Sequence, residues 1–381
     1  MKKAIKTILT AMAVAMLFIS CNADLDQKGI FESMMTSAPN ADYTIKRFAG
    51  MVGEKFLIET NTGIETLSTD GAKTTLVKGL HATVRFFDDS NNILYYSVQI
   101  PGEVSSTLRY AALPEDGTAI TESREASVKY KDIDLYIVAS FYEDGEYYLL
   151  MQDKGRHYYI AIASKGSLSD SGNAFTFTDG NITECTVRRK EVEKDGKKVF
   201  EDITPLTTTY IGEGYYAVAY DAGKNQPTNW YLYNMDGREV IFSTDKPFTS
   251  RPMAVQNMGG KSYLFLQLQA KDGINLYTIE GTAISPVKNG ENVVKHTISY
   301  LQYNQDIPMT EVDGKIYGCF GAKPFTFDGT TFADHESIGS GVVIIDMVHH
   351  TDGKYYAFSA ENGLYCSVDG QKYSRVDNTA K

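Results

Sequence analysis

Four side chains in this sequence have the chemistry to recognise a polar ligand. Trp230 is the only tryptophan, and it follows a long polar segment, residues 221–229. An indole ring offers a flat face on which a sugar ring can stack. Arg156 and Arg251 carry planar guanidinium groups that bind carboxylates or hydroxyls bidentately, and His335 adds a further polar group. We expect these four residues to bind a ligand; the alternative for Trp230 is a place at the edge of the core.

No set of residues has the spacing of a known catalytic site. The sequence contains no nucleotide-binding glycine motif, no nucleophile elbow and no haem-attachment motif. Hydrolysis of a glycosidic bond needs two carboxyl groups that flank the bond, and no such pair can be recognised. We therefore predict no catalytic residue and no cofactor, with a glycan-active hydrolase or lyase as the alternative.

Histidine and cysteine are common zinc ligands, but their spacing here does not form a site. His349 and His350 are adjacent, and neighbouring residues of a β-strand point to opposite faces. Cys185, Cys319 and Cys366 match no zinc pattern. We expect no bound metal, and we expect these cysteines to be small buried hydrophobic residues that need no disulfide.

The elements that position these residues are short β-strands, and residues 342–376 give their pattern most clearly. Turns at Asp352-Gly353, Asn362-Gly363 and Asp369-Gly370 separate four runs rich in Tyr, Phe and Val. Both central positions of the favoured hairpin turns have positive φ, which Gly, Asn and Asp tolerate. The pattern predicts a four-stranded antiparallel meander, which must stack on further copies because it cannot bury its faces alone.

The same pattern recurs seven times. Turns between third and fourth strands are expected at Asp70-Gly71, Asp116-Gly117, Asp179-Gly180, Asp236-Gly237, Glu280-Gly281, Asp328-Gly329 and Asp369-Gly370. Turns between first and second strands are expected at Gly53-Glu54, Asn91-Asn92, Asp144-Gly145, Glu213-Gly214, Gly259-Gly260, Asp313-Gly314 and Asp352-Gly353. The two series predict an all-β fold, a seven-bladed β-propeller of four-stranded antiparallel blades. The alternatives are a propeller of six or eight blades, or a pair of β-sandwiches.

Two of these turns resemble a known motif. Ser68-Thr69-Asp70-Gly71 and the segment from Ser367 to Tyr373 are similar to degenerate Asp-boxes, the turns of sialidase-type propellers. The resemblance implies a structural turn on the face away from any active site. A sialidase would also need several arginines, a Tyr/Glu nucleophilic pair and an acid/base Asp, and the sequence does not single these out.

Three segments interrupt the regular pattern. Residues 185–204 are highly charged and predict an extra hairpin, which is either solvated or a docking arm for a partner. The loops at residues 101–107 and 221–229 are long. In a propeller, loops between second and third strands share one face with the connections between blades, and irregular loops on a rigid scaffold often carry function. We therefore expect the ligand on that face, where Lys323 and Glu361 are further candidates.

The N-terminus has the features of an export signal. Three lysines precede an apolar stretch, residues 8–19, that is too short to span a bilayer. The stretch ends in Leu17-Phe18-Ile19-Ser20-Cys21, which resembles the lipobox of bacterial lipoproteins. The resemblance implies a signal peptide over residues 1–20 and lipidation at Cys21; an ordinary secretory signal is the alternative.

The remaining sequence divides at the start of the strand pattern. Residues 21–42 lack strand periodicity and are expected to be a tether, and residues 43–381 the propeller. Asp24 and Asp26 are similar to acidic surface-export signals of some lipoproteins. The net charge of −11 argues against nucleic-acid binding, which depends on clustered Lys and Arg.

These observations predict a lipid-anchored protein of the outer membrane, exposed to the periplasm or at the cell surface. We expect its propeller to be a non-catalytic binding or scaffolding module for glycans or for partner proteins. A purely structural subunit, with the charged hairpin as its docking element, is a further alternative.

The lipid anchor can be tested by one substitution. Cys21→Ser should release soluble protein from the membrane fraction, because the short apolar stretch cannot hold the chain in a bilayer. Fractionation and mass spectrometry of the mature N-terminus measure this. Wild-type protein that lacks acyl chains and begins at another residue would contradict the prediction.

Overall fold

The computed structural model describes most of the chain from Thr44 to Val376. The described residues are 44–79, 82–88, 92–99, 106–114, 118–120, 122–125, 127–143, 146–155, 157–164, 174–176, 182–185, 189–194, 197–203, 205–221, 228–235, 239–240, 248–267, 273–296, 307–361 and 363–376. The chain divides into two compact units, residues 1–44 and residues 45–381. Every described strand belongs to the second unit.

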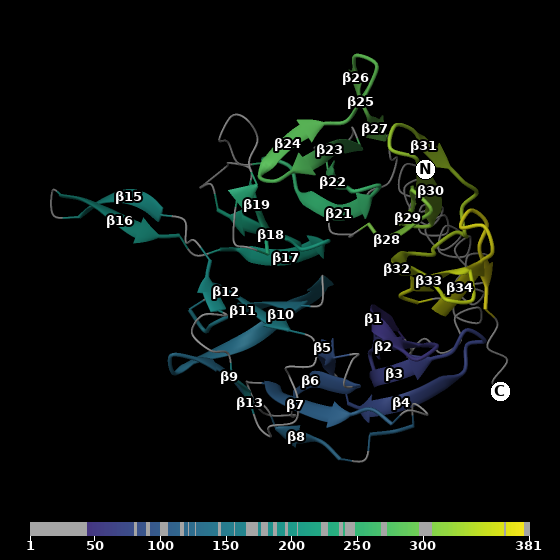
Figure 1. Cartoon of the computed structure of the whole chain (residues 1–381), viewed down its shortest axis with the longest axis horizontal. Coiled ribbons are helices and arrows are strands. Elements are labelled where there is room, and N and C mark those ends of the chain that lie inside the picture. The colour runs from purple at the N-terminus through teal and green to yellow at the C-terminus, as the bar shows by residue number, and fades with distance from the viewer. Residues whose placement is uncertain are drawn as a thin grey trace, which may run out of the picture. The chain divides into compact units, whose positions relative to one another are not determined.

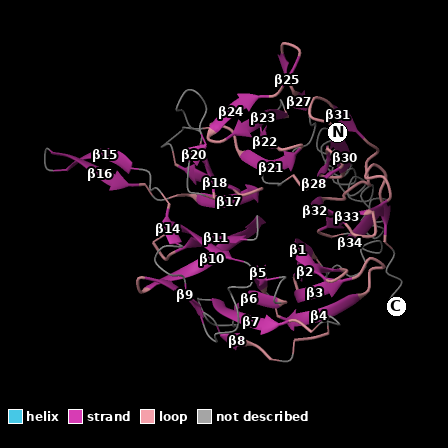
Figure 2. Ribbon diagram, in the orientation of Figure 1, coloured by secondary structure: helices cyan, strands magenta, loops and turns pink. Residues whose placement is uncertain are grey.

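Seven sheets follow one another along the chain, and each has four antiparallel strands that are adjacent in the sheet (Figures 1 and 2). Blades 1 and 2 contain β1 (Ile45–Val52), β2 (Lys55–Thr60), β3 (Gly63–Leu67), β4 (Lys73–Lys78), β5 (Thr83–Asp88), β6 (Ile93–Gln99), β7 (Ser106–Ala112) and β8 (Arg124–Glu125). Blades 3 and 4 contain β10 (Ile133–Glu143), β11 (Glu146–Gln152), β12 (Tyr158–Ser164), β14 (Ile182–Glu184), β17 (Thr207–Gly212), β18 (Tyr215–Tyr220), β19 (Asn229–Asn234) and β20 (Glu239–Val240). Blades 5, 6 and 7 contain β21 (Pro252–Met258), β22 (Lys261–Gln267), β23 (Ile274–Glu280), β24 (Ala283–Pro286), β28 (Met309–Val312), β29 (Lys315–Phe320), β30 (Lys323–Phe327), β31 (Phe332–Asp334), β32 (Ile344–His349), β33 (Tyr355–Ser359), β34 (Gly363–Ser367) and β35 (Ser374–Arg375).

The sheets form a ring in which the first strand of each blade lies nearest the centre (Figure 1). The predicted seven-bladed β-propeller is confirmed, and the alternatives of six or eight blades or of β-sandwiches are wrong. The predicted turns that the structure describes fall between the expected strands: Gly53-Glu54, Asp70-Gly71, Glu213-Gly214, Gly259-Gly260, Glu280-Gly281, Asp313-Gly314, Asp328-Gly329, Asp352-Gly353 and Asp369-Gly370. The other five lie wholly or partly outside the described residues: Asn91-Asn92, Asp116-Gly117, Asp144-Gly145, Asp179-Gly180 and Asp236-Gly237. The described residues contain no helix that is long and apolar enough to cross a membrane.

The two series of turns use different backbone conformations. Glu213-Gly214 and Asp313-Gly314 have positive φ at both residues, as predicted. At Asp369-Gly370 only the glycine has positive φ, at 70°. The Asp369 carboxylate instead accepts the backbone N–H groups of Gln371 and Lys372 at 2.9 and 3.0 Å, and these bonds lower its pKa. Aspartate is therefore used here for its acceptor oxygens, in the manner of an Asx-turn.

Seven of the described strands lie outside the four-stranded pattern, and five of them are additions to blades 3 and 5 or a small hairpin. β9 (Ser127–Tyr130) and β13 (Ala174–Thr176) extend the sheet of blade 3, and β27 (Lys295–His296) pairs with β23 of blade 5. β25 (Lys288–Asn289) and β26 (Asn292–Val293) form a small hairpin.

The charged segment between blades 3 and 4 also forms a hairpin. It consists of β15 (Arg189–Lys194) and β16 (Lys197–Asp202), and it projects away from the ring (Figure 1). The predicted extra hairpin is confirmed.

The hydrophobic core lies between blades, because alternate side chains of one strand face opposite neighbours. On β6, Leu94 and Tyr96 belong to a cluster shared with blade 1, whereas Ile93 and Tyr95 belong to one shared with blade 3. Similar clusters join blades 3 and 4, 4 and 5, 5 and 6, and 6 and 7. Each blade therefore needs both neighbours to bury its two faces.

The seventh interface, between blades 7 and 1, closes the ring and consists largely of aromatic rings. We call it the seam; its residues are Phe48, Phe56, His350, Tyr356 and Phe358. The Phe358 ring stacks on Phe48 at 5.1 Å between centroids and meets Phe56 edge-on at 5.2 Å. One backbone hydrogen bond, from Ile45 N to Ala360 O at 3.0 Å, crosses the seam. Because β1 and β35 stay in separate blades, no shared sheet holds the two ends of the propeller together.

The seam should contribute strongly to stability. Phe358 is fully buried, and replacing such a residue with alanine costs about 3–5 kcal/mol. Phe358→Ala should lower the free energy of unfolding by this amount in denaturant titrations. Val368→Ala is the control, because Val368 is 76% exposed and such changes stay within about 0.5 kcal/mol. Equal stability of the two variants would contradict the seam's role.

Candidate functional site

The strand order assigns the predicted ligand-binding residues to one face. We call this the loop face: it carries the loops between second and third strands and the connections between blades. Trp230 lies near the start of the third strand of blade 4, Arg251 just before the first strand of blade 5, and His335 just after the fourth strand of blade 6. Arg156 lies outside the described residues.

The structure does not bring these three described residues together in one pocket. Trp230 exchanges backbone hydrogen bonds with Phe248, at 2.8 and 2.9 Å, and its half-buried ring packs on the core between blades 4 and 5. That position agrees with the core-edge alternative. His335 contacts the Thr326 hydroxyl through Nε2 at 3.2 Å, and burial lowers its pKa. Arg251 is half-buried, and its carbonyl accepts the Gln267 N–H at 3.0 Å.

The further candidates on this face are also separated. Glu361 is exposed on blade 7, and Lys323 forms an ion pair with Asp334 on blade 6. The other oxygen of Asp334 lies 3.0 Å from His296 Nε2. Burial lowers the pKa of His296, although Asp334 opposes the shift. This cluster ties β27 to blade 6 and has a structural explanation.

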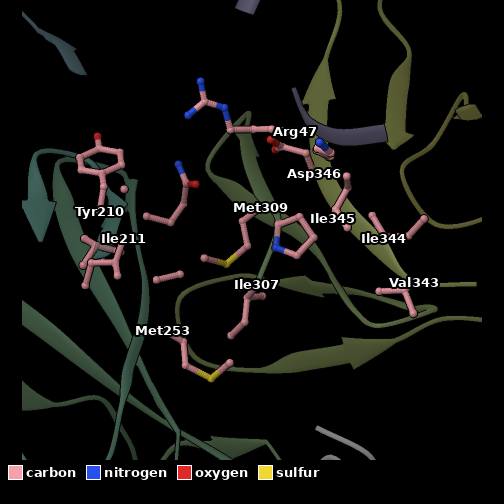
Figure 3. A pocket seen from close by; sticks show the side chains of 16 residues that line it. Arg47, Tyr210, Ile211, Met253, Ile307, Met309, Val343, Ile344, Ile345 and Asp346 are labelled. Carbon is pink, nitrogen blue, oxygen red and sulfur yellow. The ribbon is translucent and has the colours of Figure 1, made fainter. Parts of the chain in front are cut away.

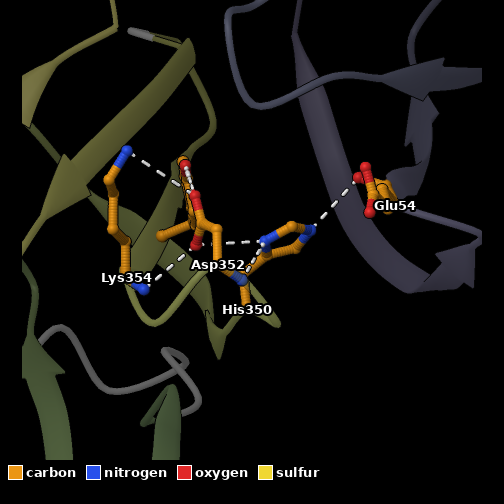
Figure 4. Close-up of polar contacts among 5 residues, drawn as sticks. Glu54, His350, Asp352 and Lys354 are labelled. Carbon is orange, nitrogen blue, oxygen red and sulfur yellow. Dashed lines mark hydrogen bonds and ion pairs between the residues drawn. The ribbon is translucent and has the colours of Figure 1, made fainter.

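His349 and His350 have separate structural contacts, as their adjacent positions predict. The His349 ring packs on Tyr355, whereas His350 contributes to the seam. His350 Nε2 donates to the Glu54 carbonyl at 3.1 Å, and its Nδ1 accepts the Asp352 N–H at 3.1 Å (Figure 4). Within the described part of the chain, no three His, Cys, Asp or Glu side chains are grouped to hold a metal ion.

A cavity of about 470 Å³ occupies the centre of the ring. We call it the central cavity. Its walls come from the first strands, or the residues just before them, of blades 1, 4, 5, 6 and 7. The lining residues are Lys46, Arg47, Tyr210, Ile211, Gly212, Met253, Ala254, Val255, Gln256, Ile307, Pro308, Met309, Val343, Ile344, Ile345 and Asp346. The volume falls within the range of about 300–1,000 Å³ of small-molecule sites.

Polar and apolar side chains occupy different parts of this cavity. In Figure 3 the polar ends of Arg47, Asp346 and Tyr210 lie in the upper part, whereas Met253 and Ile307 line the lower part. The cavity therefore offers charged groups beside an aliphatic and thioether surface.

Free strand edges add a second kind of polar group to the walls. β1, β17, β21, β28 and β32 each lie at the end of their sheet and pair with one strand. The opposite edge of a terminal strand presents backbone N–H and C=O groups. These five edges surround the cavity and supply donors and acceptors that no side-chain pattern reveals.

β-bulges determine which side chains of the first strands enter the cavity. Six of the seven first strands have a register shift against their second strand: β1, β5, β10, β17, β21 and β32. Bulges re-aim side chains and are common near functional sites. Four residues at these shifts line the cavity: Lys46, Ile211, Met253 and Ile345.

Arg47 is fixed by a buried carboxylate behind the cavity wall. Its Nη2 atom lies 2.9 Å from Glu59 Oε1 and donates to the Val84 carbonyl at 2.6 Å. Glu59 also accepts the Val84 N–H at 2.7 Å. Burial raises the pKa of Glu59, although Arg47 and the Val84 N–H favour its charged form. This network joins blades 1 and 2 and holds the guanidinium at the cavity.

The sequence analysis did not identify Lys46, Arg47 or Asp346 as site residues. One signal was present: the turn at Gly53-Glu54 makes residues 45–52 a first strand, and two adjacent cations are unusual in an inner strand. The bulges were not predictable, because a register shift depends on the pairing of two strands.

No known protein family matches this chain, and no curated protein matches its sequence. Solved structures of similar fold include the β-propeller domain of the trilobed protease from Pyrococcus furiosus, at 12% identity and a TM-score of 0.46 over 89% of this chain and 99% of that one. A catalytically inactive virginiamycin B lyase from Staphylococcus aureus, solved with quinupristin, has 11% identity and a TM-score of 0.47 over 86% and 95%. The extracellular domain of a hybrid two-component system from B. thetaiotaomicron has 11% identity and a TM-score of 0.46 over 87% and 39%. Similarity this low carries no information on the ligand or chemistry of this chain.

The raised pKa of Glu59 predicts a pH dependence of stability. The folded state binds the proton more tightly than the unfolded chain, so Glu59 lowers the free energy of unfolding as pH rises above about 4.3. Glu59→Gln removes this effect and keeps an oxygen for the Val84 N–H. The free energy of unfolding of Glu59→Gln minus that of wild type should therefore increase between pH 4 and 7, in denaturant titrations at several pH values.

Carboxylates with lowered pKa, such as Asp369, do not disturb this comparison. They titrate at lower pH and are present in both proteins. If the free energy of unfolding of Glu59→Gln minus that of wild type falls as pH rises, Arg47 outweighs burial and lowers the pKa of Glu59.

Proposed function

We propose that this protein is a lipid-anchored binding module of the cell envelope and that its ligand occupies the central cavity. The observation that carries the proposal is the composition of the cavity. Five blades contribute free strand edges, two cations, one carboxylate and an aliphatic surface to a single space.

The same composition favours binding over glycoside hydrolysis. Glycosidases of the common types place two carboxyl groups about 5–9.5 Å apart across the reacting bond. Asp346 supplies the one carboxylate among the described lining residues. The cavity therefore offers recognition groups without the acid and base that this reaction requires.

The proposed location in the cell envelope is supported by the N-terminal segment. A charged start, a short apolar stretch and Cys21 favour a lipid anchor, and residues 22–42 provide a tether between the lipid and the propeller. Trp230, Arg251 and His335 remain part of the proposal as contacts at the loop face, where a glycan or a segment of a partner protein approaches the cavity.

Filling the cavity tests this function. Ile345→Trp places a large ring at a half-buried wall position and should abolish binding of a ligand found by glycan array or metabolite screening. Trp230→Ala should weaken the same binding by a smaller factor. Lys261→Met is the control, because Lys261 is exposed and begins the second strand of blade 5, away from the cavity.

Three results would contradict the proposal. Full binding by Ile345→Trp would exclude the cavity, and loss of binding in Trp230→Ala alone would assign the ligand to the loops. Turnover of a glycan that is abolished by Asp346→Asn would show that the protein is an enzyme.

A further inference from the structure

We propose that the hairpin between blades 3 and 4 is a dimerisation arm, in which β16 pairs antiparallel with β16 of a second copy of this chain. The two hairpins then form one continuous sheet in the order β15, β16, β16, β15. This interface is separate from the central cavity and does not depend on the ligand bound there. It follows from the free edge of β16, the direction of its backbone groups and the order of its charges.

The hairpin has two free edges. β15 and β16 form a sheet of two strands, and no other described strand pairs with either of them. The hairpin projects away from the ring (Figure 1). A two-stranded hairpin is only marginally stable by itself in water, whereas a sheet of three or more strands can be stable. Edge-to-edge pairing of two hairpins would therefore stabilise both.

The register of the hairpin determines which backbone groups of β16 point outward. Lys194 and Lys197 pair across a connection of only two residues, so this pair exchanges hydrogen bonds. Hydrogen-bonded and non-hydrogen-bonded pairs alternate along an antiparallel ladder. Lys198, Phe200 and Asp202 therefore direct their N–H and C=O groups to the outer edge of β16. A second strand can pair with these groups.

The charges of β16 are complementary to those of a second copy. The strand reads Lys-Lys-Val-Phe-Glu-Asp. A two-fold axis at Phe200 places this residue opposite its own copy, and it places Lys198 opposite Asp202 of the second copy on both sides of the axis. Aromatic pairs and opposite charges at directly opposed positions stabilise an antiparallel sheet. The pairing therefore has an aromatic centre between two attractive charge pairs.

This pairing does not require Lys198 to be free within its own chain. Lys198 has an interaction there and stands opposite Glu193 of β15. A strand inside a sheet has a neighbour on each side. Lys198 can therefore face Glu193 on one side and Asp202 of the second copy on the other.

The charges of β15 disfavour the same kind of pairing. This strand reads Arg-Lys-Glu-Val-Glu-Lys. A two-fold axis at Glu191 places two glutamates opposite each other, and one at Val192 places Lys190 opposite Lys194. Like charges at directly opposed positions destabilise a sheet and protect an edge from pairing. The dimer should therefore form through β16.

Sedimentation velocity over a range of protein concentrations tests the dimer. The full chain is used in a Cys21→Ser background, which removes any contribution of a lipid anchor to association. The chain should dimerise. Lys198→Asp and Asp202→Lys should each weaken dimerisation at least about tenfold, because two attractive pairs become repulsive. Lys261→Asp is the control, since it makes the same charge change at an exposed residue of blade 5, and it should leave dimerisation unchanged.

A mixture of the two hairpin variants separates pairing between copies from damage within each hairpin. In a dimer of one Lys198→Asp chain and one Asp202→Lys chain, both charge pairs are again attractive. The equimolar mixture should therefore form heterodimers at concentrations at which each variant alone is monomeric. Damage within a hairpin would not be reversed by mixing.

Hydrogen exchange tests whether the dimer uses strand pairing. The amides of Phe200 and Asp202 should exchange more slowly as the protein concentration rises, whereas that of Val199, which is already bonded to β15, should change less. Three results would overturn the inference: a chain that remains monomeric at all concentrations, a dimer that neither hairpin variant weakens, and a mixture that forms no heterodimer. None of these results bears on the central cavity.

Discussion

The packing of Phe358 against Phe48 and Phe56, stacked on the first ring and edge-on to the second, is the interaction on which the ring depends. Every other interface joins blades that follow each other in the chain, so a short connection keeps them close. Blade 1 is the first and blade 7 the last along the chain, and each consists of its own consecutive strands. Their association must therefore come from side-chain burial and a few hydrogen bonds. Large aromatic rings are suited to this task, because each buries a large apolar area.

The seam also determines the shape of the central cavity. β32 of blade 7 supplies Ile345 and Asp346, and β1 of blade 1 supplies Lys46 and Arg47. These residues face one another only while blades 7 and 1 remain in contact. The polar part of the seam supports the same contact, because His350 donates to the Glu54 carbonyl at the turn that ends β1. Ring closure and the shape of the cavity thus depend on the same two blades.

The sequence predicted the fold because its local signals were strong. Seven pairs of turns, most of them with Gly beside Asp, Glu or Asn, set the strand lengths, and alternating Tyr, Phe and Val residues supplied two apolar faces for each blade. The prediction was incomplete at Asp369, where the carboxylate accepts backbone N–H groups and φ is not positive. The hairpin of residues 189–202 was predictable because its charge pattern interrupts the repeat.

The cavity was much harder to predict than the fold. Trp230 and Arg251 stood out by residue type, yet Trp230 packs on the core and neither residue lines the cavity. The charged lining residues are of common types: Lys46 and Arg47 on β1, and Asp346 on β32. β1 and β32 are neighbours in the ring although they belong to the first and the last blade along the chain. A bulge at Lys46 and another at Ile345 bring these strands' side chains into one space, and a bulge depends on the register between two strands. These residues can be identified as lining the cavity only from the assembled ring.

Hydrogen exchange of the wild-type protein with and without a ligand found by glycan array or metabolite screening tests most directly whether the central cavity is the binding site. A ligand that pairs with the free strand edges protects their amides from exchange. The account predicts slower exchange in β1, β21, β28 and β32, from four separate blades, with little change in the hairpin of residues 189–202. Protection confined to the loop-face segments around Trp230 and Arg251, with unchanged exchange in these four strands, would contradict it.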